Sequence, residues 1–451
     1  MGFISAIIHK IAKYYIEESY MKKNIFILLL AIMLSCCSFT VFAATNPPEI
    51  TGDSVVVMDA STGEVVYGKS ENDQYPPAST TKLMTILLTL ENCDLNEVVT
   101  VGDYPPTIEG SKIYIGTGEQ LTVEQMLYSV IMVSANDCAT ALAEHISGSV
   151  EAFAELMNSR AKKLGCLNTH FCNPHGLYED EHRTTTYDLA LIEKELLKYP
   201  KYIEISQTKS SSIEPTNTFT ETRPLWNDNR LLHEYYNCYY PAALAGKTGY
   251  TDESLHSYVA SAKKGDSTFI IAILHDKYKA YYNEVPGLFD WAFENFGTEK
   301  AFSKGEQIGT YTTSNGTEIP LIAKEDLSYT KDLTTDSAVS VNINTSVIDG
   351  KFFSTGDVIT TADVTYGNQS YTIDVLSGSD YYQETIPVLG NLLTTEENTI
   401  NYKSLWIIIG CIAAAVIIFI LLLIRLIKIR ILAKKRNKIW NSYYGNNKHK
   451  Y

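Results

Sequence analysis

Three short segments of the chain carry residue types that could act together in nucleophilic catalysis. Ser79 is followed three residues later by Lys82, and Ser134-Ala135-Asn136 and Lys247-Thr248-Gly249 follow in that order. A serine hydroxyl is a weak nucleophile at neutral pH and needs an adjacent base. Residues i and i+3 share a helix face, so the Lys82 amine can take the Ser79 proton if its pKa is lowered by burial or by nearby cations. Ser-x-x-Lys alone is common by chance, but all three segments in order indicate a serine–lysine acyl-transfer site.

The segments around these residues predict a rigid mixed scaffold. Residues 55–59 and 65–68 read as strands around a turn at 61–63. The run from Lys82 to Leu88 is apolar nearly all round, which predicts a buried helix that fixes the nucleophile. Further helices are expected from helical spacing and further strands from β-branched runs. The expected helices are 121–134, 139–146, 152–164 and 288–296, and the expected strands are 257–262 and 268–274.

Charge is unevenly distributed along the 451 residues, which are enough for two or three domains. Lys and Arg number 4 before Thr45 and 9 from Leu405 on, against 2 and 0 acidic residues. The stretch between carries 24 basic and 50 acidic residues, a net charge of −26. A body this acidic argues against nucleic acid as a partner.

Two apolar segments predict the location of the protein. Met21-Lys22-Lys23 precedes an apolar run at 25–34 and the small residues of 41–44, the layout of a secretory signal peptide, with an N-terminal anchor as the alternative and Met21 as a second possible start. Residues 405–424 carry no charge, are long enough to span a bilayer, and are followed at once by basic residues. The positive-inside rule then predicts a cell membrane protein with a single span and its acidic body on the extracytoplasmic side.

The composition predicts six successive parts. After residue 302 Thr, Ser, Val and Ile dominate between regular turns, which suggests a small all-β domain. The expected parts are an N-terminal extension and signal peptide (1–44), a catalytic domain (45–300), an all-β domain (301–393), a tether (394–404), a transmembrane helix (405–424) and a basic cytoplasmic tail (425–451).

Five cysteines remain outside the signal and the span, and they do not form a dense disulfide framework. Cys166 and Cys172 could pair, but free thiols are expected for most of the five, and no zinc-binding spacing is present. The five are Cys93, Cys138, Cys166, Cys172 and Cys238.

The motifs and their flanks resemble one family. Residues 77–85, 132–137 and 246–251 resemble the three motifs of low-molecular-mass penicillin-binding proteins, the serine-type D-alanyl-D-alanine carboxypeptidases, and 173–177 resembles their middle loop. The resemblance implies the β-lactamase-like catalytic domain of those proteins, of α+β or α/β class, before the all-β domain and the C-terminal transmembrane helix. It also implies removal of the terminal D-alanine from peptidoglycan pentapeptides through an acyl-serine, covalent binding of β-lactams, and no metal or organic cofactor.

The family's residue roles carry over to matching positions. Ser79 is implied as the nucleophile, Lys82 as the general base and Ser134 as the proton shuttle. Asn136 is implied to bind the acyl side chain's amide, and Lys247 and Thr248 of the Lys-Thr-Gly249 motif to hold the terminal carboxylate. The backbone N–H groups of Ser79 and Tyr250 are implied as the oxyanion hole, since an oxyanion needs fixed donors.

Two departures from the family and several alternatives stay open. Leu255-His256 stands where the family has a small-residue pair, and Arg230 could add positive potential or form a surface salt bridge. His175 and His182 are expected to order a loop, Asp188 to start a helix and Cys138 to pack in the core. A class A-like β-lactamase would need a Glu-x-x-x-Asn near Asn168, which is not present; a non-enzymatic β-lactam sensor or scaffold is the second alternative.

Overall fold

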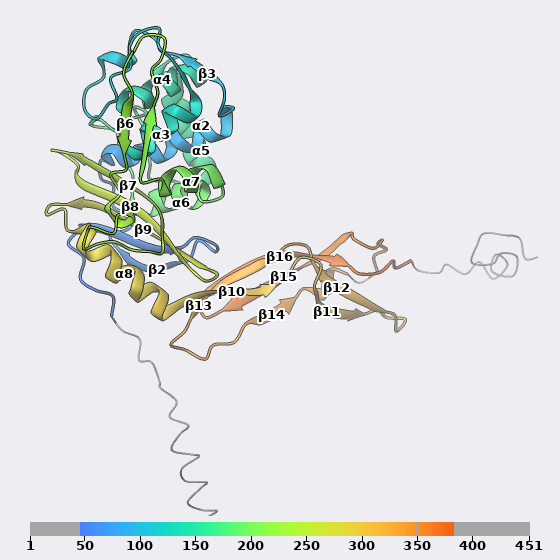
Figure 1. The fold of residues 1–451 in the computed structure, drawn as a ribbon. Coiled ribbons are helices and arrows are strands. Elements are labelled where there is room, and N and C mark those ends of the chain that lie inside the picture. The colour runs from blue at the N-terminus through green and yellow to red at the C-terminus, as the bar shows by residue number, and fades with distance from the viewer. Residues whose placement is uncertain (1–45, 349, 383–451) are drawn as a thin grey trace, which may run out of the picture. The chain divides into compact units, whose positions relative to one another are not determined.

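The computed structural model describes residues 46–348 and 350–382. Up to Asn295 the described chain combines strands with helices (Figure 1). The strands are β1 (Ser54–Asp59), β2 (Val65–Lys69), β3 (Val98–Thr100), β4 (Gln120–Thr122), β5 (Ser210–Ile213), β6 (Arg223–Trp226), β7 (Ala243–Thr251), β8 (Leu255–Lys264) and β9 (Ser267–Asp276). The helices are α2 (Lys82–Asn92), α3 (Val123–Met132), α4 (Asn136–Ser147), α5 (Val150–Leu164), α6 (Thr186–Leu196), α7 (Pro200–Gln207) and α8 (Tyr281–Asn295), with 3-10 turns η1 (Ala78–Thr81), η2 (Pro105–Thr107) and η3 (Arg230–Leu232).

The central element is a five-stranded antiparallel sheet in the order β2-β1-β9-β8-β7. Strand β1 pairs with β2 on one side and with β9 on the other, so the sheet brings together the beginning and the end of this region. Strand β7, which carries Lys247, lies at the edge and pairs only with β8 on its inner side. One side of the catalytic motif strand is therefore open to a ligand.

The two faces of the sheet contribute to two separate cores. Along β1, Val56 and Met58 pack with helices α2 to α7, whereas Val55 and Val57 pack on the other face with α8. Figure 1 shows α8 on one face and α6 and α7 on the other. This alternation follows from the period of two of a strand, whose successive side chains point to opposite faces.

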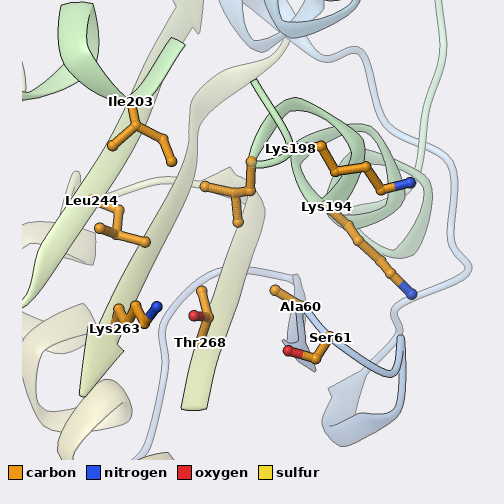
Figure 2. Close-up of a pocket in the computed structure, with 9 residues that line it drawn as sticks. Ala60, Ser61, Lys194, Lys198, Ile203, Leu244, Lys263 and Thr268 are labelled. Carbon is orange, nitrogen blue, oxygen red and sulfur yellow. The ribbon is translucent and has the colours of Figure 1, made fainter. Parts of the chain in front are cut away.

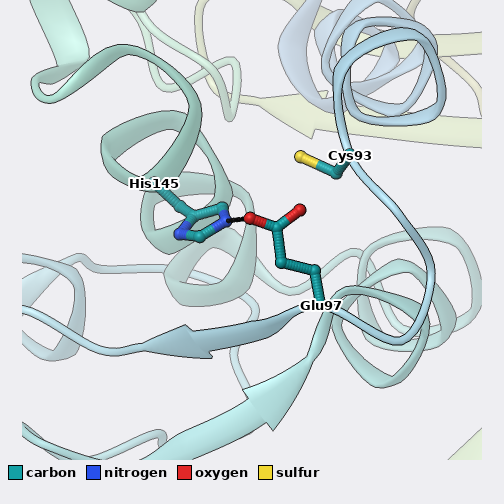
Figure 3. A group of neighbouring side chains, drawn as sticks. All are labelled: Cys93, Glu97 and His145. Atoms are coloured by element: carbon teal, nitrogen blue, oxygen red, sulfur yellow. Dashed lines mark hydrogen bonds and ion pairs between the residues drawn. The ribbon is translucent and has the colours of Figure 1, made fainter.

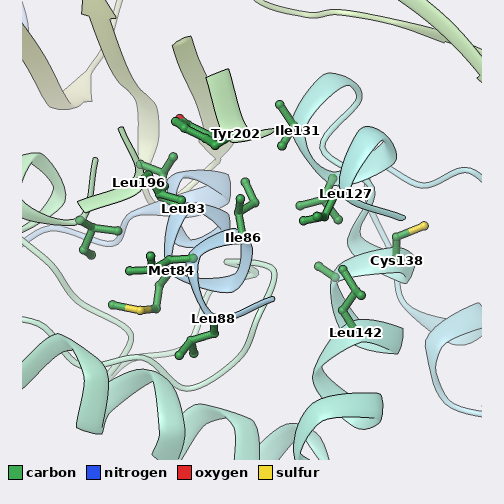
Figure 4. Packing of buried hydrophobic residues seen from close by; sticks show 14 of the residues in the cluster. Leu83, Met84, Ile86, Leu88, Leu127, Ile131, Cys138, Leu142, Leu196 and Tyr202 are labelled. Atoms are coloured by element: carbon green, nitrogen blue, oxygen red, sulfur yellow. The ribbon is translucent and has the colours of Figure 1, made fainter. Parts of the chain in front are cut away.

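Helix α2 is surrounded by other elements, as its apolar sequence predicted. Every residue from Lys82 to Thr89 is buried. Leu83, Ile86 and Leu88 pack among residues of α3, α4, α6 and α7 (Figure 4). The first residue of this helix is Lys82, so the packing that holds α2 also holds the predicted base.

The predicted closing helix begins earlier than expected. The expected range is 288–296, whereas α8 starts at Tyr281 and includes Pro286. Tyr281, Tyr282 and Val285 are buried in the core on that face. Burial of these side chains outweighs the hydrogen bond that proline removes.

From Phe296 to Ser377 the described residues form strands and one 3-10 turn. One sheet has the order β11-β12-β16-β15-β14, and β10 pairs with β13. The elements are β10 (Phe296–Phe302), β11 (Gln307–Thr312), β12 (Glu318–Ala323), β13 (Leu327–Asp332), β14 (Ser340–Ile343), η4 (Thr345–Val347), β15 (Val358–Tyr366) and β16 (Gln369–Ser377). Residues 350–355 and 379–382 belong to a separate compact unit, in which Phe353 forms a β-bridge with Tyr381.

The predicted membrane segments are not among the residues that the structure describes. The signal peptide, the tether, the span at 405–424 and the basic tail lie outside the described residues, as do the last residues of the expected all-β domain. Among the described residues, none of the helices has the length and apolar character that crossing a bilayer requires.

Candidate active site

The predicted nucleophile lies on the tight turn η1, directly before α2. Ala78 precedes it with φ of 49°, a left-handed conformation that is uncommon for a residue with a Cβ. Gly176, with φ of 87°, lies against this turn, and a Cβ there would overlap the Ala78 carbonyl. The close packing of these two backbone segments therefore holds the turn that carries Ser79 in place.

Lys82 is hydrogen-bonded to Ser79. Its Nζ lies 2.9 Å from Ser79 Oγ and 2.6 Å from the His175 carbonyl oxygen. The side chain is completely buried, and desolvation, followed by repulsion from Lys247, holds its pKa well below the ordinary value, although Asp137 raises it. A lysine in this state can exist as a neutral amine, the form that accepts a proton.

A hydrogen bond between a lysine and a serine also joins the second and third motifs. Lys247 Nζ donates to Ser134 Oγ at 2.9 Å and to the Thr248 carbonyl oxygen at 2.9 Å. Burial lowers the pKa of Lys247 to about 8, with Asp228 acting in the opposite direction. Ser134 has φ of 60°, so the helical pattern of α3 ends in a strained residue whose hydroxyl is directed at a lysine.

Asn136 presents an unused acceptor. Its Nδ2 donates to the Glu109 carbonyl oxygen at 2.7 Å, and this bond fixes the amide. Its Oδ1 is buried and has no hydrogen-bond partner among the described residues. A buried acceptor without a partner costs stability, so a ligand N–H at this position would satisfy it.

The Ser79 backbone presents an N–H donor close to strand β7. The Ser79 N–H lies in the first turn of η1, where backbone donors lack a partner within the helix. A Cβ on Gly249 would lie 2.8 Å from Ser79 N and would also overlap Ser257 Oγ. Glycine is needed at 249 because β7 approaches the nucleophile closely.

A cleft of about 380 Å³ opens over these groups and is lined in part by residues outside the three motifs. Ser79, Ser134, Thr248, Gly249 and Tyr250, all among the predicted site residues, line this cleft. The additional lining residues are Ser111, Asp228, His256, Lys279 and Tyr281. Of these, only Asp228, two residues before Arg230, and His256, in the Leu255-His256 pair, lie near a residue that the sequence singled out.

The two departures now have structural explanations. His256 lines the cleft and its ring lies 4.5 Å from that of Tyr250, so the rim here is aromatic rather than small. The Arg230 guanidinium lies over Tyr236 at 4.9 Å and Tyr282 at 5.3 Å and forms no salt bridge with a described residue. Burial raises the pKa of the cleft residue Asp228, and the charge of Arg230 acts against this shift, so Arg230 adds positive potential at the cleft, one of the two expectations.

The two histidines form hydrogen bonds in the loop before α6. His182 Nδ1 accepts from Cys172 N at 3.0 Å, and its Nε2 lies 2.8 Å from Thr81 Oγ1. His175 Nδ1 accepts from Leu177 N at 3.2 Å. Burial is the main cause that lowers the pKa of each to about 3, so both rings are neutral at pH 7 and order the loop, as expected.

The remaining predicted structural residues behave as expected. Asp188 lies in the first turn of α6, with its N–H bonded to Thr185 Oγ1. Cys138 is buried in the helical core (Figure 4). All five cysteines of the described chain are free, so Cys166 and Cys172 are not paired.

Two other features lie apart from the cleft. A cavity of about 470 Å³ is lined by apolar side chains with Ser61 and three lysines, Lys194, Lys198 and Lys263 (Figure 2). Within the described residues no hydrogen bond joins Ser61 to these lysines, so the cavity lacks the nucleophile–base pair of the cleft. Metal-ligating residue types converge at Cys93, Glu97 and His145 in the described part of the chain (Figure 3).

Known proteins are similar to this chain in sequence and in fold. A family model described as D-alanyl-D-alanine carboxypeptidase matches residues 41–278. D-alanyl-D-alanine carboxypeptidase DacF of Bacillus subtilis (strain 168) is 33% identical over 323 residues, which cover 68% of this chain and 81% of that protein. The structure of penicillin binding protein 5 from Haemophilus influenzae is similar at a TM-score of 0.64 and 26% identity, over 74% of this chain and 99% of that one.

A structure titled D-alanyl-D-alanine carboxypeptidase from Mycobacterium tuberculosis H37Rv has a TM-score of 0.52 and 28% identity, over 56% of this chain and 95% of that chain. The family match covers more than half of the chain and includes all three motifs. The described fold has the mixed α and β content of these proteins. The chain belongs to the D-alanyl-D-alanine carboxypeptidase family of serine peptidases.

Proposed function

We propose that this protein removes the terminal D-alanine of peptidoglycan peptides through an acyl enzyme on Ser79. The observation that carries the proposal is the 2.9 Å contact between Ser79 Oγ and the buried Lys82 Nζ. As a neutral amine, Lys82 takes the hydroxyl proton while Ser79 Oγ attacks the carbonyl carbon before the last residue. The peptide C–N bond then breaks and leaves an ester on Ser79.

The remaining groups of the cleft act on different parts of the substrate. The N–H groups of Ser79 and Tyr250 stabilise the oxyanion, and the orphaned Oδ1 of Asn136 accepts from an amide N–H of the acyl part. Lys247 and Thr248 hold the free terminal carboxylate by charge-assisted hydrogen bonds.

Ser134 is placed to return the proton to the leaving amine, because it is hydrogen-bonded to Lys247 and lines the same cleft as Ser79. Water then hydrolyses the ester and releases the shortened peptide. β-Lactams acylate Ser79 by the same route, with the ring amide bond taking the place of the peptide bond. All these steps use side chains and backbone of this chain.

Replacement of the nucleophile tests the assignment. Ser79→Ala should abolish both hydrolysis of a D-alanyl-D-alanine peptide and covalent labelling by a fluorescent penicillin, with an unchanged circular dichroism spectrum. Ser61→Ala, which removes a hydroxyl from the other cavity, is the matched control and should keep both activities. Labelling that persists in Ser79→Ala would show that another residue is the nucleophile.

Penicillin turnover separates the carboxypeptidase from a β-lactamase. An acyl enzyme that stays intact by mass spectrometry for many peptide turnovers is expected here. Rapid release of hydrolysed penicillin would favour the β-lactamase alternative, and a stable adduct without peptide hydrolysis would favour a sensor.

We also propose that residues 405–424 anchor the protein in the cell membrane with its catalytic residues outside. The charge-free length and the basic residues that follow support this topology. A chain truncated before Leu405, with the signal retained, should be released in soluble and active form. A truncated protein that stays with the membrane after signal cleavage would point to a second anchor.

A further inference from the structure

Three side chains of different chemical type meet at the end of α2 that lies away from Ser79. Cys93 is the residue that caps the C-terminus of α2, Glu97 directly precedes β3, and His145 lies in the last turn of α4. Figure 3 shows the three side chains directed toward one another. One ligand atom from each, Sγ, a carboxylate oxygen and an imidazole nitrogen, lies within 4.8 Å of the other two.

The spacing suits a small metal ion after minor adjustment. A tetrahedral zinc ion with bonds of about 2.0–2.3 Å holds its ligands about 3.3–3.8 Å apart. His145 Nε2 and Glu97 Oε1 are 2.9 Å apart and would each turn slightly to face the ion. His145 and Glu97 are exposed, so their side chains can rotate with little loss of packing. Cys93 is half-buried, so its side chain is held more firmly in place.

The set of donors selects the ion. Thiolate and imidazole together favour zinc over magnesium or calcium, which take oxygen ligands. We propose that Cys93, Glu97 and His145 bind one Zn²⁺ ion, with water as the fourth ligand. On binding, the Cys93 thiol releases its proton to solvent, and the charges of thiolate and carboxylate balance that of the ion.

The surroundings explain why Cys93 is not simply a reactive thiol. Desolvation and the carboxylate of Glu97 raise its pKa to about 11, so without a cation the thiol stays protonated at neutral pH. A divalent ion reverses this balance because it pairs with the thiolate. The hydrogen bond between His145 and Glu97 could form without Cys93. The Cys93 thiol is therefore the feature that distinguishes a metal site from an exposed ion pair.

The site would join two helices that also carry active-site residues. Helix α2 begins with Lys82 and ends at Asn92, next to Cys93, and α4 begins with Asn136 and contains His145 near its end. The 11 residues of α2 span about 16 Å, so the ion would lie well away from the chemistry. We therefore expect zinc to stabilise the helical core without entering the reaction.

Cobalt and zinc binding to the purified full chain test the proposal. Co²⁺ should give the intense near-ultraviolet absorption of a cobalt–thiolate bond, and Zn²⁺ should displace it at one equivalent. At a hundredfold excess over its Kd, Zn²⁺ should raise Tm by roughly 5 °C. Cys93→Ser should abolish the cobalt–thiolate band, and His145→Gln should weaken Zn²⁺ binding by more than about tenfold.

Cys172→Ser is the matched control, because Cys172 is also half-buried and also lies near a histidine, with Sγ 3.7 Å from His170 Nδ1. It should bind Co²⁺ and Zn²⁺ like the parent protein, and so should Ser79→Ala, since the site does not depend on catalysis. His145 is exposed, so His145→Gln should fold even if Cys93→Ser does not. An absent cobalt–thiolate band in the parent, or equal zinc affinity in the parent and His145→Gln, would overturn the proposal.

Discussion

The floor and the rim of the cleft use charged residues in opposite ways. On the floor, Lys82 and Lys247 are buried, each is hydrogen-bonded to a serine hydroxyl, and burial lowers both pKa values. On the rim, Lys279 and Asp228 are exposed as residues, although partial burial of the Asp228 carboxyl raises its pKa. Charged groups around one cleft thus lie in two different dielectric environments.

This difference in burial decides whether a charged group can take part in proton transfer or only alters the affinity for substrate. A buried lysine loses solvation, so its proton becomes available to a neighbouring hydroxyl at neutral pH. An exposed charge is screened by water and salt, so its effect on a bound substrate is small. Substitutions on the floor should therefore change rates by orders of magnitude and those on the rim by small factors.

The largest effect is expected at Lys82. Lys82→Gln removes the base and should lower the rate of Ser79 acylation by at least about a hundredfold, because a positioned base contributes roughly 10²–10⁴. The measurement is the rate of penicillin labelling by stopped flow. Lys194→Gln is the control, since Lys194 also has a pKa lowered by desolvation but lies in the other cavity. Similar rates in Lys82→Gln and the parent would exclude Lys82 as the base.

Lys247 should have the next largest effect. A hydrogen bond to a charged group is worth roughly 1.5–3 kcal/mol, so Lys247→Gln should lose about one to two orders of magnitude in kcat/KM on peptides with a free carboxylate. The loss should be smaller on a peptide with an amidated terminus. Lys247→Arg should not restore full activity, because a planar guanidinium differs in shape from an ammonium. Equal losses on both substrates would place the role of Lys247 on the proton path through Ser134.

The two buried lysines also predict a bell-shaped pH profile. Lys82 must lose its proton to act, so kcat/KM rises as pH increases through its lowered pKa. Lys247 must keep its proton to hold a carboxylate, so kcat/KM falls as pH rises through about 8. In Lys247→Arg the falling limb should move to higher pH, because guanidinium stays protonated. If the falling limb is unchanged in Lys247→Arg, the loss of activity at high pH would have to be assigned to another titrating group.

On the rim, Asp228 should have a small effect of the opposite sign. Its carboxylate lines the cleft beside Thr248, where it repels a terminal carboxylate. Asp228→Asn should raise kcat/KM on such peptides by roughly two- to fivefold at low salt, and less at high salt. Asp266→Asn, an exposed change in the turn between β8 and β9, is the control. A loss of activity in Asp228→Asn would mean that the carboxylate binds substrate.

The smallest effect on activity is expected at Glu193, a buried carboxyl group that does not line the cleft. It accepts hydrogen bonds from Tyr202 and Ser261, and burial raises its pKa to about 7. The folded state binds its proton more tightly than the unfolded state, so this residue's contribution to stability falls as pH rises from about 4.5 to 7. Glu193→Gln should raise Tm at pH 8, leave it nearly unchanged at pH 4, and preserve kcat/KM. An equal shift at both pH values would contradict the assigned pKa.

The sequence alone determined the chemistry and the main elements. Ser79, Lys82, Ser134 and Lys247 were selected by type and spacing, and α2 was predicted from an apolar run that is buried as expected. Local patterns suffice here because a helix or strand follows from the periodicity of neighbouring residues. The start of α8 was missed because burial of Tyr281 and Tyr282 overrides a local proline signal.

Only the tertiary structure decided which distant residues meet. Asp228, His256 and Lys279 come from three loops or strand ends and share one cleft with Ser79. They are too far apart in the sequence for a local pattern to show that they meet in the fold. Likewise, Cys93, Glu97 and His145 lack a zinc-binding spacing and are joined only by the packing of α2, β3 and α4. Lys82 and Lys247 acquire lowered pKa values from burial in the folded core, because desolvation depends on what surrounds a charge in three dimensions.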